Sequence, residues 1–125
     1  MNLKLTMKVI IFLIGTLLLT FNTIAKEPED CVKRGPTKSN DEYENYRMAR
    51  YVIMENKVRL NVFNNNENKL PKLSRNESYY EFDLGQDGFS GRGRHRVVIL
   101  TQDNPKKILA SYFTQDHYRN FCKIR

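Results

Sequence analysis

Three kinds of side chain in the second half of the chain could together cleave a phosphodiester. Glu81 lies in an alternating segment, Arg92, Arg94 and Arg96 follow it, and His117 comes after the next predicted strand. RNA carries its own nucleophile, the 2′-OH, so its cleavage needs a base, cations that stabilise charge at phosphorus, and an acid for the leaving oxygen. A carboxylate, guanidinium groups and an imidazole supply these functions without a metal or a cofactor. Taken singly, each of these residues is more often a solvated charge, and only their order favours a site.

Strands must position this set. The segment Ser78–Leu84 alternates, which predicts a strand with Glu81 and Asp83 on its polar face. Short apolar segments that are separated by polar turns, before and after Ser78–Leu84, predict four further strands. These are Val58–Phe63, Arg96–Thr101, Lys107–Phe113 and Tyr118–Ile124. If neighbouring strands pair as a meander, one face can gather the carboxylate, the arginines and the histidine.

One helix is predicted before the strands. Ser39 and Glu42 have the spacing of a capping box, and a helix to about Asn56 would place Tyr46, Ala49 and Ile53 on one buried face. The preceding polar stretch, 26–40, is expected to be an extended arm. The fold class is therefore α+β, an N-terminal helix packed on an antiparallel β-sheet of about five strands.

Three ordered motifs resemble the barnase-like microbial guanyl-specific ribonucleases. Asp116–Arg125 (DHYRNFCKIR) is similar to the closing segment of that family. Phe63–Pro71 (FNNNENKLP) resembles its guanine-binding loop, and Tyr80–Leu84 (YEFDL) resembles the strand that carries its catalytic glutamate. The resemblance extends from about Val58 to Arg125. It implies the microbial ribonuclease fold.

The resemblance also implies roles for individual residues. Glu81 corresponds to the general base, His117 to the general acid, and Arg92 and Arg96 to the pair that binds the phosphate. Arg94 matches no family arginine and is expected to be a solvated charge, and His95 is expected to be dispensable. The residues implied in guanine binding are Phe63, Asn65, Asn66, Glu67 and Tyr118.

The guanine loop reads the edge of the base. The Glu67 carboxylate would accept from N1–H and the 2-amino group, and backbone N–H groups around Asn65 and Asn66 would donate to O6, whereas adenine would leave these groups unpaired. Phe63 could support the base or only pack in the core. The family has arginine at the position of Asn66, which leaves the strictness of the guanine preference open.

The activity implied is cleavage of single-stranded RNA 3′ of guanosine. A 2′,3′-cyclic phosphate forms by transesterification and is then hydrolysed to a 3′-phosphate. RNA is the expected partner, no cofactor or metal is implied, the protein is expected to be a monomer, and the family resemblance allows an intracellular inhibitor protein of the barstar type. The alternative is a secreted basic module that binds RNA without turnover.

The first 25 residues have the features of a secretory signal peptide. Lys4 and Lys8 precede an apolar run of 11 residues, Val9–Leu19, and small residues lead to Ala25. The run is short for a membrane anchor, which is the alternative. Residues 26–125 then form a single ribonuclease domain in the extracellular space, without stable membrane association.

The net charge and the two cysteines are consistent with export, but they are less specific indicators than the signal-peptide pattern. Without Lys4 and Lys8 the 21 basic residues fall to 19, against 14 acidic residues, which leaves a net charge of about +5. Cys31 and Cys122, the only cysteines, lie near the two ends of the mature domain. In an oxidising compartment we expect them to form a disulfide, with two free thiols as the alternative.

Overall fold

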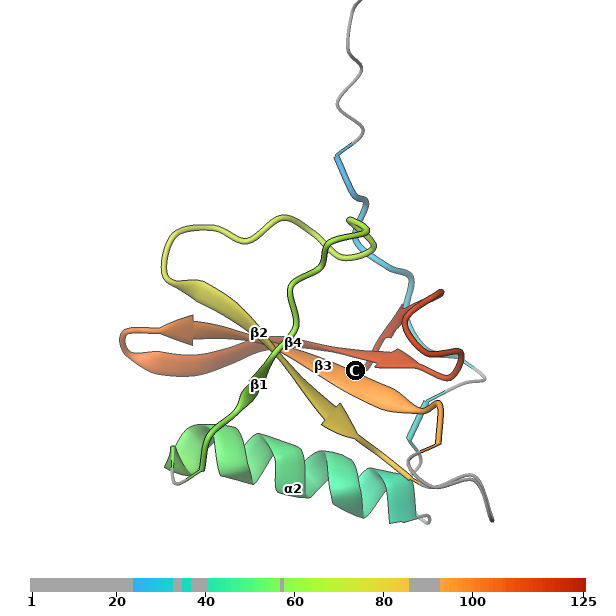
Figure 1. Ribbon diagram of the computed structural model, residues 1–125, viewed down its shortest axis with the longest axis horizontal. Helices are drawn as coiled ribbons and strands as arrows, with labels where there is room; N and C mark the ends of the chain where they lie inside the picture. Colours follow the sequence, from blue (N-terminus) through green and yellow to red (C-terminus); the bar gives the residue numbers. More distant parts are fainter. Residues whose placement is uncertain (1–23, 33–34, 37–40, 57, 86–92) are drawn as a thin grey trace, which may run out of the picture.

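One helix packs on a five-stranded antiparallel sheet within the part of the chain that the computed structural model describes, residues 24–32, 35–36, 41–56, 58–85 and 93–125 (Figure 1). The helix is α2 (Asp41–Glu55). The strands are β1 (Asn61–Val62), β2 (Glu77–Asp83), β3 (Arg96–Asp103), β4 (Lys106–Thr114) and β5 (Cys122–Lys123). The strands pair in chain order as a meander, each antiparallel to the next. The predicted α+β fold is confirmed.

Helix α2 lies across one face of the sheet, below it in Figure 1. Its acidic first turn suits the positive end of the helix dipole, and its three predicted inward residues, Tyr46, Ala49 and Ile53, are all buried. The helix ends at Glu55, and the next residue, Asn56, adopts a left-handed conformation (φ 52°) and donates its backbone N–H to the carbonyl of Val52. The proposed capping residue Ser39 lies outside the described residues.

Both faces of the sheet bury apolar side chains. On the helix side, Leu84, Val97, Ile99 and Phe113 pack against α2. On the opposite side lies a second cluster, formed by Leu70, Tyr79, Val98 and Tyr112. The predicted alternation of β2 is confirmed, since Tyr80, Phe82 and Leu84 belong to the helix side and Glu81 and Asp83 lie on the other face. That second face also buries Tyr79, which is 1% exposed.

The two edge strands are shorter than predicted. Only Asn61–Val62 of the expected first strand pairs with β2, opposite Tyr80 and Glu81. The expected last strand, Tyr118–Ile124, is reduced to Cys122–Lys123. The reason is that His117 and Tyr118 adopt left-handed conformations (φ 54° and 69°), which extended strands exclude.

The N-terminal arm runs beside β5. Asp30 forms a parallel bridge with Lys123, and the Cys31 N–H donates to the carbonyl of Lys123 over 2.8 Å. Cys31 and Cys122 form a disulfide, as predicted, with their Cα atoms 4.9 Å apart. The bond ties the arm to the end of the sheet. Among the described helices, none is long and apolar enough to cross a membrane.

Candidate active site

A loop between β1 and β2 forms one wall of the site, and a single asparagine closes it. The Asn65 side chain donates to the carbonyl of Leu70 over 2.8 Å and accepts from the Leu70 N–H over 3.0 Å. The Asn68 N–H donates to the carbonyl of Asn65, and both asparagines have positive φ, which asparagine tolerates well. Leu70 is fully buried and anchors the loop to the core. The Asn65 side chain is therefore engaged within the loop, where it holds the turn closed.

This loop opens onto a cavity of about 290 Å³ that all five predicted guanine-binding residues line. The same cavity reaches Glu81, so the structure brings the predicted base-binding residues and the predicted general base together. The complete lining is Val62, Phe63, Asn64, Asn65, Asn66, Glu67, Lys69, Glu81 and Tyr118. Lys69 is an exposed cation that the sequence reasoning did not single out.

Phe63 belongs both to the cavity and to the core. Its ring stacks on that of Tyr118, with centroids 5.3 Å apart and planes at 29°. Its edge contacts involve Tyr79 and Phe121, and the Phe63 N–H donates to the carbonyl of Tyr79. The two interpretations of Phe63 are therefore compatible, because the core fixes the ring that forms the cavity wall.

Tyr118 connects the cavity to Glu81. Burial and, second, a hydrogen bond with the Glu81 carboxylate raise the pKa of Tyr118 to about 12, although the nearby Arg96 acts in the opposite direction. The phenol therefore remains protonated at neutral pH and donates to Glu81. The family resemblance implied that Tyr118 lies beside a bound base, but the sequence did not predict this contact with the carboxylate.

Arg96 is the buried cation of the site, only 4% exposed. Its Nε lies 2.7 Å from a carboxylate oxygen of Asp83, which sits opposite Arg96 in the β2–β3 register. Its Nη1 donates to the carbonyls of Gly93 and His95 over 2.7 and 2.9 Å. Strand register and loop carbonyls thus fix the guanidinium close to Tyr118, which also contacts Glu81. Arg92, the other predicted phosphate-binding arginine, lies outside the described residues, and Arg94 is exposed, as expected.

His117 is exposed in a tight turn after β4 and lies beside the cavity lining. The centroid of the His117 ring is 4.8 Å from that of the Tyr118 ring. The backbone N–H of His117 donates to the carbonyl of Arg94 over 3.3 Å. Two consecutive left-handed residues, His117 and Tyr118, cost of order 1–3 kcal/mol each. Such conformations persist only where surrounding contacts impose them.

Asp116 supplies those contacts. Its carboxylate accepts from the backbone and side-chain N–H groups of Asn120, over 2.9 and 2.7 Å, and from the Thr114 hydroxyl. The Tyr118 N–H in turn donates to Thr114 Oγ1. Burial raises the pKa of Asp116, but the hydrogen bonds from Asn120, Thr114 and the Arg119 backbone outweigh it and lower the pKa overall. The ionised carboxylate holds the turn in the shape that exposes His117.

A second cavity, of about 210 Å³, adjoins the other side of Glu81. Asp83 and the exposed cation Arg59 line it. Arg59 lies two residues before β1, and it was not singled out from the sequence. Within the described ranges, no three His, Cys, Asp or Glu side chains gather as a set that could hold a metal ion.

The cavity, the carboxylate, the buried arginine and the histidine turn define a site suited to an anionic substrate with a planar base. A family model for ribonucleases matches residues 18–125 of this chain. The chain therefore belongs to the ribonuclease family, and RNA is its substrate. No curated protein matches it.

Two solved structures of ribonuclease Sa2 are similar to this fold. One, of complexes with mononucleotides, is 23% identical over 80% of this chain and 95% of that chain, with a TM-score of 0.49. The other, with guanosine-2′-cyclophosphate, is 22% identical over 80% of this chain and 97% of that chain, with a TM-score of 0.47.

Proposed function

We propose that this ribonuclease cleaves single-stranded RNA on the 3′ side of guanosine by metal-independent acid–base catalysis. The observation that carries the proposal is the cavity of about 290 Å³ in which the loop at Asn65–Glu67 and the carboxylate of Glu81 share one space. A nucleotide whose base contacts that loop would have its 2′-OH and 3′-phosphate directed toward Glu81.

Each step of the reaction has a group in this chain. Glu81 accepts the proton of the 2′-OH, which attacks phosphorus and forms a 2′,3′-cyclic phosphate. Arg96 stabilises the charge on the phosphorane, together with Arg92, for which the proposal rests on the sequence motif. His117 protonates the leaving 5′-oxygen, and hydrolysis of the cyclic phosphate reverses the roles of Glu81 and His117.

Guanine preference is proposed to come from the loop. The Glu67 carboxylate accepts from N1–H and the 2-amino group, and backbone N–H groups at Asn65 and Asn66 donate to O6. Phe63 and Tyr118 lie against the base. The side chain of Asn65 holds the loop closed through its two hydrogen bonds with the Leu70 backbone, and we assign base contact to its backbone N–H.

The test is cleavage of a defined oligonucleotide that contains one guanosine, in excess EDTA, with mapping of the product ends. We expect one cut, after guanosine, and a transient cyclic phosphate. Glu81→Gln and His117→Ala should each remove most turnover. Glu77→Gln on the same strand and Gln115→Ala in the same turn are matched controls that should retain it.

The outcomes separate the alternatives. RNA binding without cleavage would indicate the module without turnover. Full activity of His117→Ala, or loss of activity in EDTA, would contradict the acid–base mechanism. Because Glu81 must be ionised and His117 protonated at the same time, the rate should follow a bell-shaped dependence on pH.

We further propose that residues 1–25 are a signal peptide and that 26–125 is a monomeric extracellular domain, which an intracellular inhibitor protein could restrain in the producing cell. The disulfide between Cys31 and Cys122 supports export, since such bonds persist in oxidising compartments. Sequencing of the exported protein should give Lys26 as its first residue, and retention of the first 25 residues would contradict the assignment.

A further inference from the structure

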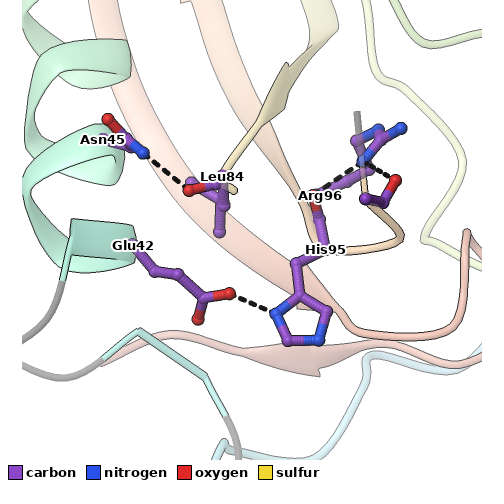
Figure 2. Close-up of polar contacts among 6 residues, drawn as sticks. Glu42, Asn45, Leu84, His95 and Arg96 are labelled. Carbon is purple, nitrogen blue, oxygen red and sulfur yellow. Dashed lines mark hydrogen bonds and ion pairs between the residues drawn. The ribbon is translucent and has the colours of Figure 1, made fainter. Parts of the chain in front are cut away.

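The connection between β2 and β3 is fastened at both ends to the first turns of helix α2 (Figure 2). At one end, the Asn45 side chain donates to the carbonyl of Leu84 over 2.6 Å. At the other end, the Glu42 carboxylate contacts Nδ1 of His95. Residues 42 and 95 are 53 positions apart, so this contact exists only in the folded chain.

His95 is held on a second side as well. The edge of its ring meets Phe113, with centroids 5.5 Å apart and planes at 80°. The two contacts fix the ring although it is partly exposed. The charged side chain that contacts it is Glu42 from the helix, and the contact with Phe113 comes from the sheet.

The backbone around His95 holds the reactive groups. The carbonyl of His95 accepts from the Leu84 N–H over 3.2 Å and from Nη1 of Arg96 over 2.9 Å. The carbonyl of Gly93 accepts from the same guanidinium nitrogen, and the carbonyl of Arg94 accepts from the His117 N–H. Three successive carbonyls, at residues 93–95, therefore help to hold the arginine and the histidine, together with Asp83 and the Asp116 turn.

We propose that Glu42, Asn45 and His95 form a brace that positions the arginine and the general acid for catalysis. The brace residues touch no substrate and act through the carbonyls of residues 93–95. This replaces the sequence-based expectation that His95 is dispensable. The inference rests on the proposed function, because it assigns Arg96 and His117 their roles there.

The test compares kcat and KM of the purified protein for a guanosine-containing dinucleotide. Glu42→Ala and His95→Ala should each lower kcat by about 10- to 100-fold, since a displacement of about 1 Å costs that much in an aligned site. KM should change little, because the brace does not line the guanine cavity. Each variant is first shown to be folded at the assay temperature by its thermal unfolding curve.

Two comparisons distinguish positioning from a purely structural role. His95→Asn keeps an amide donor near the place of Nδ1 and should restore most of kcat. The double variant of Glu42→Ala and His95→Ala should lose no more than either single variant, because the two side chains act as one unit. Glu44→Gln is the matched control: it removes a charge from the same turn, where Glu44 forms an exposed ion pair with Arg47, and kcat should stay unchanged.

Failure of the inference is distinct from failure of the proposed function. If the parent protein does not cleave RNA, the proposed function is wrong. If the parent cleaves RNA and folded Glu42→Ala and His95→Ala retain its kcat, the brace has no positioning role. Losses that multiply in the double variant, or no recovery in His95→Asn, would also overturn the inference.

Discussion

Removal of the Asp116 carboxylate should cost this ribonuclease both stability and activity. In Asp116→Ala, the Asn120 backbone and side-chain N–H groups and the Thr114 hydroxyl lose their acceptor. A hydrogen bond to a charged group contributes about 1.5–3 kcal/mol, and water replaces part of that at a partly exposed carboxylate, so we expect a net loss of about 2 kcal/mol. For a domain of this size that corresponds to a fall in Tm of roughly 8–16 °C.

The effect on activity follows from the conformation of the turn. His117 and Tyr118 hold left-handed conformations that the Asp116 contacts impose, and without them the turn relaxes to ordinary φ values. The imidazole then leaves its place beside Tyr118, and kcat should fall by about 100-fold. Single-turnover cleavage of a guanosine dinucleotide measures this loss at a temperature where the variant remains folded.

The pH dependence carries a definite sign. The folded-state pKa of Asp116 lies below its ordinary value of 3.8, so its contribution to stability is present above that value and is lost as pH falls through the folded pKa. The difference in unfolding free energy between parent and Asp116→Ala should therefore be full near pH 6 and shrink in strong acid.

Asp103→Ala is the matched control. The Asp103 carboxylate accepts from the hydroxyls of Ser78 and Thr101 at the opposite end of β3 from Arg96. The Asp103→Ala substitution should lower the Tm of the protein while leaving its kcat unchanged. A folded Asp116→Ala protein with the parent's kcat would refute the idea that the turn's shape presents His117.

Three further perturbations test other parts of the site. Glu67→Gln should lower the preference for guanosine over adenosine by about 5- to 150-fold in kcat/KM, the equivalent of 1–3 kcal/mol, with less effect on total cleavage of RNA, and an unchanged ratio would contradict base contact by Glu67. Tyr118→Phe keeps the ring stack on Phe63 but removes the phenol that contacts Glu81, so kcat should fall more than KM rises; steady-state kinetics check this. Thiol titration of unreduced protein should find no free cysteine, and reduction should lower the free energy of unfolding by about 4–5 kcal/mol for a bridge spanning 91 positions.

Much of the fold follows from patterns that short stretches of sequence carry. Helical spacing identified the buried face of α2, and alternation located β2. The ends of the sheet did not follow, because Tyr118–Ile124 has the composition of a strand while Asp116 imposes a turn on its first half. Composition alone cannot show a carboxylate that accepts hydrogen bonds from a residue four positions later.

The candidate site was predictable where a motif keeps its residues close in sequence. The loop from Phe63 to Glu67 does line one cavity, because Asn65 closes it locally. The contacts of Asp83 with Arg96 and of Glu42 with His95 were missed, since they join segments that only the register of β2 and β3 and the placement of α2 bring together. No spacing rule relates residues 42 and 95.

The parts of the site differ in what supports them, and this determines how substitutions should behave. Glu81 and Arg96 lie on paired central strands, so a change that disturbs the β2–β3 register alters stability and activity together. The guanine loop depends on the amide of Asn65 and can change specificity while the sheet remains intact. His117 stands on a strained turn that depends on Asp116 and on the carbonyl of Arg94, so substitutions there should, under the proposed function, lower turnover while guanine binding survives. Under the proposed function, specificity and turnover should therefore be separable, because different hydrogen-bonded segments support the loop and the histidine turn.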